Sequence, residues 1–151
     1  MLNFGANKKS KYSVEIHGKA ELDVFYKIIK FSKEQIHEEM KTILNAGKDV
    51  ENKIENSIFK YNIICEMQNT LADIDDYVGI GNDETIYVEV EGPEEAELMA
   101  EYAAKMFDNL LKQGFNDKNK DVENTAMNIT YSSSIFSKLS KIANLSTTKP
   151  E

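Results

Sequence analysis

The chain has 151 residues, the length of one domain that can bury its own core. Its formal net charge is −8, and all 18 of its basic residues are lysines. Arginine supplies the planar group that recognises phosphates and base edges, and a negative protein repels a polyanion, so the composition argues against direct nucleic-acid binding. Lysine-only usage with many asparagines and isoleucines is typical of an AT-rich genome, such as that of a low-GC bacterium or one of its phages.

The sequence predicts a cytoplasmic protein, in the host cytoplasm if a phage encodes it. Cys65 is the single cysteine, so an intramolecular disulfide is excluded. The basic segment 1–11 is not followed by the apolar stretch of a signal peptide, and no run of residues is apolar for long enough to span a membrane. We expect segment 1–11 to be a flexible basic arm.

The first half of the chain predicts one strand and two long helices. Apolar and polar residues alternate over 12–17, as in a half-buried strand. Apolar residues then recur at helical spacing over about 20–76, which predicts a long helical hairpin with its turn near Gly47. Within it, 58–68 also alternates and is rich in β-branched and aromatic residues, so a strand is an alternative there.

The middle of the chain predicts a β-hairpin and a third helix. Strand-like segments at 77–81 and 85–91 flank an acidic, glycine-adjacent turn. Pro93 and the carboxylates that follow it are typical of a helix start, and the apolar pattern continues over 93–113. Together the elements predict an α+β fold, in which a small antiparallel sheet packs with the helices, in one domain over 12–115.

The C-terminal part is predicted to lie outside this domain. Residues 116–131 are polar and charged, which indicates a linker that could include an edge strand. An amphipathic helix over 132–146 should follow, and 147–151 should be disordered. An isolated helix this short is marginal in water, so its apolar face must be covered, either by its own domain or by another chain. That face carries the candidate partner-binding residues Ile135, Phe136, Leu139, Ile142 and Leu145.

A weak internal repeat links the two predicted strand-to-helix junctions. Residues 14–21 (VEIHGKAE) resemble residues 88–95 (VEVEGPEE), 74 positions later when Val88 is aligned with Val14. The pattern indicates either a duplicated βα unit or the convergence that is common at strand-to-helix turns.

Acidic residues gather in one stretch of the sequence, the candidate acidic patch Asp73, Asp75, Asp76, Asp83 and Glu84. Hard oxygens could ligate a divalent ion, but a helix end running into a solvated turn explains them better. Segment 117–121 resembles the start of a calcium loop, yet Val122 stands where glycine is required and Asn128 where the bidentate glutamate is required. The sequence therefore predicts neither a metal nor a cofactor.

No catalytic set of residues is evident. His37 begins a sequence like the zinc protease motif, but Lys41 occupies the place of the second histidine, and Cys65 lies in an apolar run without a histidine partner. We expect a non-catalytic protein that acts through protein contacts, an accessory protein, inhibitor or adaptor that could also form homo-oligomers. Two alternatives are an acidic mimic of nucleic acid that blocks a host DNA- or RNA-binding protein, and a small-ligand-binding oligomer.

Overall fold

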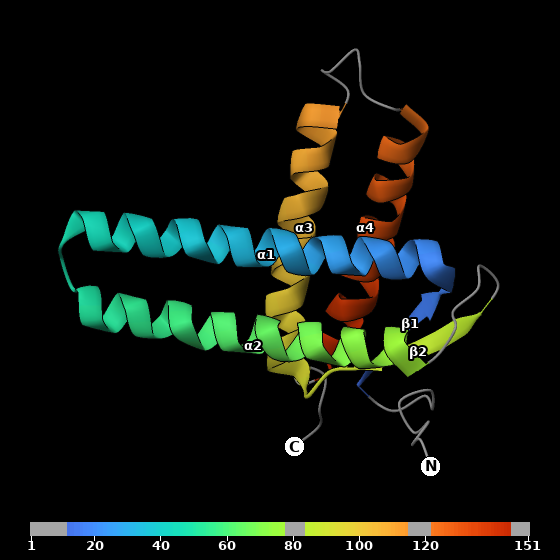
Figure 1. Cartoon of the computed structure of the whole chain (residues 1–151), viewed down its shortest axis with the longest axis horizontal. Coiled ribbons are helices and arrows are strands. Elements are labelled where there is room, and N and C mark those ends of the chain that lie inside the picture. Colours follow the sequence, from blue (N-terminus) through green and yellow to red (C-terminus); the bar gives the residue numbers. More distant parts are fainter. Residues whose placement is uncertain (1–11, 78–83, 115–121, 146–151) are drawn as a thin grey trace.

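The computed structural model describes residues 12–77, 84–114 and 122–145 (Figure 1). This part of the chain is mostly helical, with a two-stranded antiparallel sheet, so the predicted α+β class is confirmed. The elements in chain order are β1 (Ser13–His17), α1 (Gly18–Ala46), α2 (Val50–Tyr77), β2 (Thr85–Glu89), α3 (Pro93–Gly114) and α4 (Val122–Ala143).

The sheet consists of β1 and β2, which are far apart in the sequence. They pair antiparallel with Val14 opposite Val88, and beyond the paired residues the Val90 N–H donates to the Tyr12 carbonyl over 2.8 Å. Side chains alternate along both strands, so the valines and isoleucines are buried while His17 on the opposite face is exposed. One face of the sheet therefore contributes to the core.

α1 and α2 lie antiparallel beside each other, joined by residues 47–49 (Figure 1). Gly47 ends α1 in the left-handed conformation, with φ of 68°, and its N–H donates to the Ile43 carbonyl over 3.3 Å. Glycine adopts this conformation without steric strain, which makes it a common helix end. Segment 58–68 is helical within α2, so the strand alternative is wrong.

α3 and α4 form a second pair of neighbouring helices, which crosses the first pair steeply (Figure 1). Pro93 begins α3 as predicted, with Glu94 and Glu95 in the first turn, where the helix dipole favours negative charge. The prediction for the start of α4 was wrong. The helix begins at Val122 rather than near 132, so no edge strand forms within the described part of 116–131.

The polar side chains at the start of α4 explain this error. Thr125, Asn128 and Ser132 are buried, and polar residues without an apolar stripe look like a linker in the sequence. In the fold, Asn128 Oδ1 accepts a hydrogen bond from Lys27 Nζ over 3.0 Å, and Ser132 Oγ donates to the Ile129 carbonyl over 3.1 Å. These bonds give the buried Asn128 carbonyl oxygen and Ser132 hydroxyl hydrogen-bond partners.

Several predicted segments lie wholly or partly outside the described residues. These are the arm over 1–11, most of the strand at 77–81, the start of the linker over 116–131, and the tail over 147–151. Tyr77, the first residue of the predicted strand, is instead the last residue of α2.

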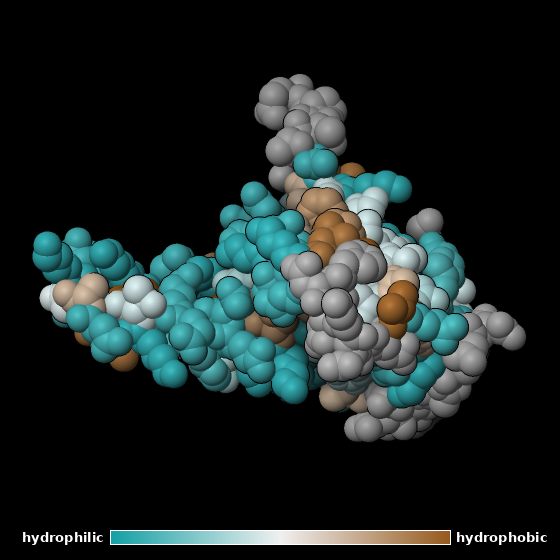
Figure 2. Space-filling view, turned by 90° about the horizontal axis from the view of Figure 1, so that it is seen from above, coloured by the Kyte–Doolittle hydropathy of each residue, from teal (hydrophilic) through white to brown (hydrophobic). Residues whose placement is uncertain are grey.

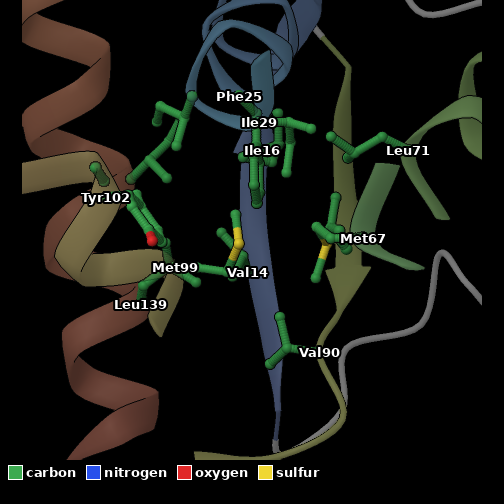
Figure 3. Close-up of a cluster of buried hydrophobic side chains, with 14 of the residues drawn as sticks. Val14, Ile16, Phe25, Ile29, Met67, Leu71, Val90, Met99, Tyr102 and Leu139 are labelled. Atoms are coloured by element: carbon green, nitrogen blue, oxygen red, sulfur yellow. The ribbon is translucent and has the colours of Figure 1, made fainter. Parts of the chain in front are cut away.

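One hydrophobic core joins both strands to the two helical pairs (Figure 3). Figure 3 shows labelled side chains of α2 on one side of the cluster and those of α3 and α4 on the other, with Val14 and Ile16 of β1 between them. Leu139 of α4 has no exposed surface, which shows that this helix docks on its own chain. Residues labelled in this cluster are Val14, Ile16, Phe25, Ile29, Met67, Leu71, Val90, Met99, Tyr102 and Leu139.

α1 and α2 extend past the other helices as a two-helix arm, defined here as residues 37–56 (Figure 1). None of these residues is buried, and Leu44 on α1 is 60% exposed. Figure 2 shows that the visible surface of the arm is largely hydrophilic. Near its base, Lys60 Nζ and Glu39 Oε1 form an ion pair at 2.9 Å. Among the described residues, no helix is both long and apolar enough to cross a membrane.

Candidate functional site

An acidic cleft of about 680 Å³ lies where α2 passes the junction between β2 and α3. Four of its lining residues are glutamates and none is a lysine, while Phe59, Ile63 and Pro93 give it an apolar wall. The cleft therefore combines negative charge with exposed apolar surface. Its lining residues are Phe59, Asn62, Ile63, Glu66, Glu91, Gly92, Pro93, Glu94 and Glu95.

The start of α3 positions Glu95 in this cleft. Its side chain turns back over the first turn of the helix, and Oε1 accepts a 2.8 Å hydrogen bond from the Glu91 N–H. This bond pairs the backbone N–H of Glu91, which lies two residues before the helix begins, much as in a capping box. Glu95 is only 7% exposed, and no other described residue forms a hydrogen bond or salt bridge with its carboxylate. A buried carboxylate with one partner is costly unless a cation or a proton reaches it.

Glu66 of α2 and Glu91 bring two more carboxylates to the same place. One carboxylate oxygen from each of Glu66, Glu91 and Glu95 lies within 4.8 Å of the others. Burial raises the pKa of Glu95; the hydrogen bond from the Glu91 N–H opposes this, and the negative charges of Glu91 and Glu66 raise the pKa further. Because like charges are held together, the group attracts a cation or binds a proton.

The predicted acidic patch is not assembled within the described residues. Asp73 is exposed on α2, and Glu84 is exposed beside the start of β2, where its carbonyl accepts the Gly18 N–H over 2.6 Å. Asp75 and Asp76 belong to α2, but their side chains lie outside the described structure, as does the whole of Asp83.

The structure buries most of the predicted partner-binding face. Ile135, Leu139 and Ile142 lie in the core of their own chain, and Leu145 is half-buried. Phe136 alone among the five residues is exposed, at 39%. Docking on the same chain, one of the two alternatives, is therefore what the structure shows, and the buried residues are not available to a partner.

The residues of the cleft escaped sequence reasoning for different reasons. Glu91 and Glu95 stand in the internal repeat, which aligns them with His17 and Glu21, so a signal was present there. Glu66 had none, because only the packing of α2 against the β2–α3 junction brings it to them. Phe59 was not singled out in the sequence, and the structure leaves its side chain 62% exposed.

Comparisons of the chain with protein-family models, with curated proteins and with solved structures found no match.

Proposed function

We propose that the protein is a non-catalytic protein-interaction protein that binds a positively charged segment of a partner protein at the acidic cleft. The observation that carries this proposal is Phe59, an aromatic side chain 62% exposed at the wall of a cleft with four glutamates. Interface energy concentrates in a few apolar or aromatic anchors, whereas complementary charge accelerates association and excludes wrong partners. Phe59 provides the anchor, and Glu66, Glu91 and Glu94 provide the charge.

Two further observations support a basic partner. Ile58, the residue before Phe59 in α2, does not line the cleft but is 46% exposed, so a second apolar side chain is open to solvent near the cleft wall. The titratable side chains that line the cleft are all carboxylates, so a second copy of this acidic protein would meet like charges there. A basic protein segment with an apolar side chain would bind more tightly, because it can contact both the carboxylates and the apolar wall of the cleft.

The alternative of a nucleic-acid mimic has one observation in its favour. Such a mimic needs carboxylates gathered on one face, and the cleft gathers Glu66, Glu91, Glu94 and Glu95. A nucleic-acid-binding protein presents a basic surface of the kind that this face would attract. We place both roles in the cytoplasm of a low-GC bacterium, or of the host of one of its phages, on the evidence of composition.

Selection of peptides from a random displayed library tests the proposal. The wild-type protein should enrich peptides with lysine or arginine next to an aliphatic or aromatic residue, and binding should weaken as salt is raised. Phe59→Ser should weaken binding of the selected peptides at least about tenfold, the loss expected for a hot-spot anchor. Leu44→Ser is the matched control, because Leu44 is equally exposed but lies on the arm, and it should leave binding unchanged. Enrichment of neutral or acidic peptides, or equal losses in the two variants, would refute the proposal.

A further inference from the structure

The two strand-to-helix junctions use the same device. At the first, the Glu21 Oε1 accepts the His17 N–H over 2.7 Å, and at the second the Glu95 Oε1 accepts the Glu91 N–H over 2.8 Å. Both glutamates are buried, at 1% and 7% exposed. Each glutamate therefore uses Oε1 to cap its helix, and its second carboxylate oxygen is left to interact with a neighbouring group.

The first junction provides a cation from within the chain. The Oε2 of Glu21 accepts hydrogen bonds from Lys138 Nζ over 2.9 Å and from Ser134 Oγ over 3.0 Å. Lys138 Nζ also donates to the Glu15 carbonyl over 2.5 Å. The buried charge of Glu21 is thus paired and fully hydrogen-bonded, which is the condition for tolerating it in a core.

α2 packs beside the second junction in the way that α4 packs beside the first: Glu66 of α2 lies near Glu95, and Ser134 and Lys138 of α4 contact Glu21. Five buried side chains of α2 correspond to five buried side chains of α4 at one offset of 68 residues (Ser57 to Thr125), whereas the buried Asn128 of α4 corresponds to Lys60, which is half-buried. In this alignment Glu66 corresponds to Ser134 and Thr70 corresponds to Lys138. The corresponding buried residues are Ser57, Ile64, Met67, Leu71 and Ile74 in α2, and Thr125, Ser132, Ile135, Leu139 and Ile142 in α4.

The second junction therefore has the Glu66 carboxylate where the first has the Ser134 hydroxyl. It has Thr70 where the first has Lys138, so it lacks the ammonium group. Thr70 is too short to reach a carboxylate as Lys138 does, and its hydroxyl donates instead to the Glu66 carbonyl over 3.1 Å. Within the described residues, no salt bridge reaches Glu66, Glu91 or Glu95. Three carboxylates converge where the equivalent site holds an ammonium group.

We propose that Glu66, Glu91 and Glu95 bind a divalent cation of calcium size, which takes the place that the Lys138 ammonium occupies at the first junction. Calcium binds oxygens at roughly 2.3–2.6 Å, so two of its ligands can lie up to about 5 Å apart, whereas Mg²⁺ requires roughly 2.0–2.1 Å. Carboxylate oxygens within 4.8 Å of one another can reach one such ion. The choice of calcium rests on its flexible coordination geometry, because Mg²⁺ demands a near-ideal octahedron. A divalent ion also offsets three carboxylates better than one ammonium does, and the open cleft leaves room for water ligands.

Calcium titration of the isotope-labelled protein, followed by NMR, tests this site. With three protein ligands, the dissociation constant should be about 10⁻⁴–10⁻³ M. Amide shifts should centre on Glu66 and residues 91–95, and paramagnetic Mn²⁺ should broaden the same signals. Glu95→Gln should weaken calcium binding at least about tenfold, whereas Glu94→Gln, which removes a neighbouring charge but no ligand, should leave it within about threefold.

Copying the first junction gives a second, independent test. Thr70→Lys combined with Glu66→Ser should place an ammonium and a hydroxyl beside Glu95, abolish calcium binding and raise the melting temperature in the absence of calcium. Phe59→Ser should leave calcium affinity unchanged, so this inference and the proposed partner binding can fail separately. Absence of calcium-dependent shifts at millimolar calcium, or equal calcium affinities of Glu95→Gln and wild type, would overturn the inference.

Discussion

Val14 and Val88 lie opposite each other in the sheet and are also equivalent residues of the internal repeat. An antiparallel pair in which a residue meets its own repeat partner has an approximate two-fold axis at that pair. The pairings on either side agree. Ser13 pairs with Glu89, and their repeat equivalents, Tyr87 and Glu15, pair with each other. The described elements follow one another as two βαα segments, β1–α1–α2 and β2–α3–α4, and the strand register fits a two-fold relation at the sheet.

Replacement of Lys138 by methionine should strongly destabilise the protein. It leaves the Glu21 carboxylate, 1% exposed, without its cation, and breaking a buried pair from one side costs about 3–5 kcal/mol. Chemical denaturation measures the loss. Lys141→Met on the exposed face of the same helix is the control and should change stability by less than about 0.5 kcal/mol. Similar losses in both variants would contradict the assigned role of Lys138.

Glu95→Gln should stabilise the protein at neutral pH and have a smaller effect in acid. Because the pKa of Glu95 is raised in the folded state, the folded protein holds a proton that the unfolded chain has released. The stabilisation from that proton is present below the ordinary carboxyl pKa and is lost as the pH rises through the raised pKa. Thermal melts of the variant and wild type should therefore converge at low pH, in calcium-free buffer. A constant difference at every pH would refute the prediction.

Gly18→Ala should destabilise the protein by about 1–2 kcal/mol, the cost of forcing a side chain into the left-handed region. Gly18 has φ of 82°, so any Cβ is strained there. Gly92, its equivalent in the repeat, lacks a positive φ, and an added Cβ would meet nothing within 4 Å. Gly92→Ala should be tolerated. Urea denaturation of the two variants tests this difference, and equal midpoints would contradict it.

Leu139→Ala should cost about 2–5 kcal/mol, because it opens a cavity in the core. The side chain of Leu139 is fully buried, whereas Phe136 on the same helix is 39% exposed. Phe136→Ala should therefore cost much less. Guanidinium denaturation of both variants also tests the docking of α4 on its own chain. An unchanged midpoint for Leu139→Ala would show that α4 does not pack there in solution.

Local sequence patterns predicted the elements whose apolar periodicity is strong, and missed those in which polar groups are buried. The alternation around Val14 and the proline at the start of α3 identified β1 and α3 correctly. The first turns of α4 escaped because Thr125 and Asn128 enter the core as polar residues. The hydrogen-bond partner of Asn128 is Lys27 on α1, so no local sequence pattern predicts the burial of Asn128.

The cleft was unpredictable for a related reason. Glu66 is separated from Glu95 by a helix end and a strand, and only the crossing of the two helical pairs brings their carboxylates together. The repeat did mark Glu21 and Glu95 as equivalent. Their different surroundings depend on Lys138 and Thr70, which lie on helices outside the repeated segments.

The two-helix arm has a consequence for how the molecule fluctuates. Residues 37–56 contain no buried side chain, so separation of the arm's helices exposes little apolar surface and breaks none of the core shown in Figure 3. The arm can open locally while the sheet and the buried core stay folded. The free energy of local opening is small where few apolar side chains are buried. Its amide hydrogens should therefore exchange with solvent well before those of the core, and insertions near Gly47 should leave the rest of the molecule folded.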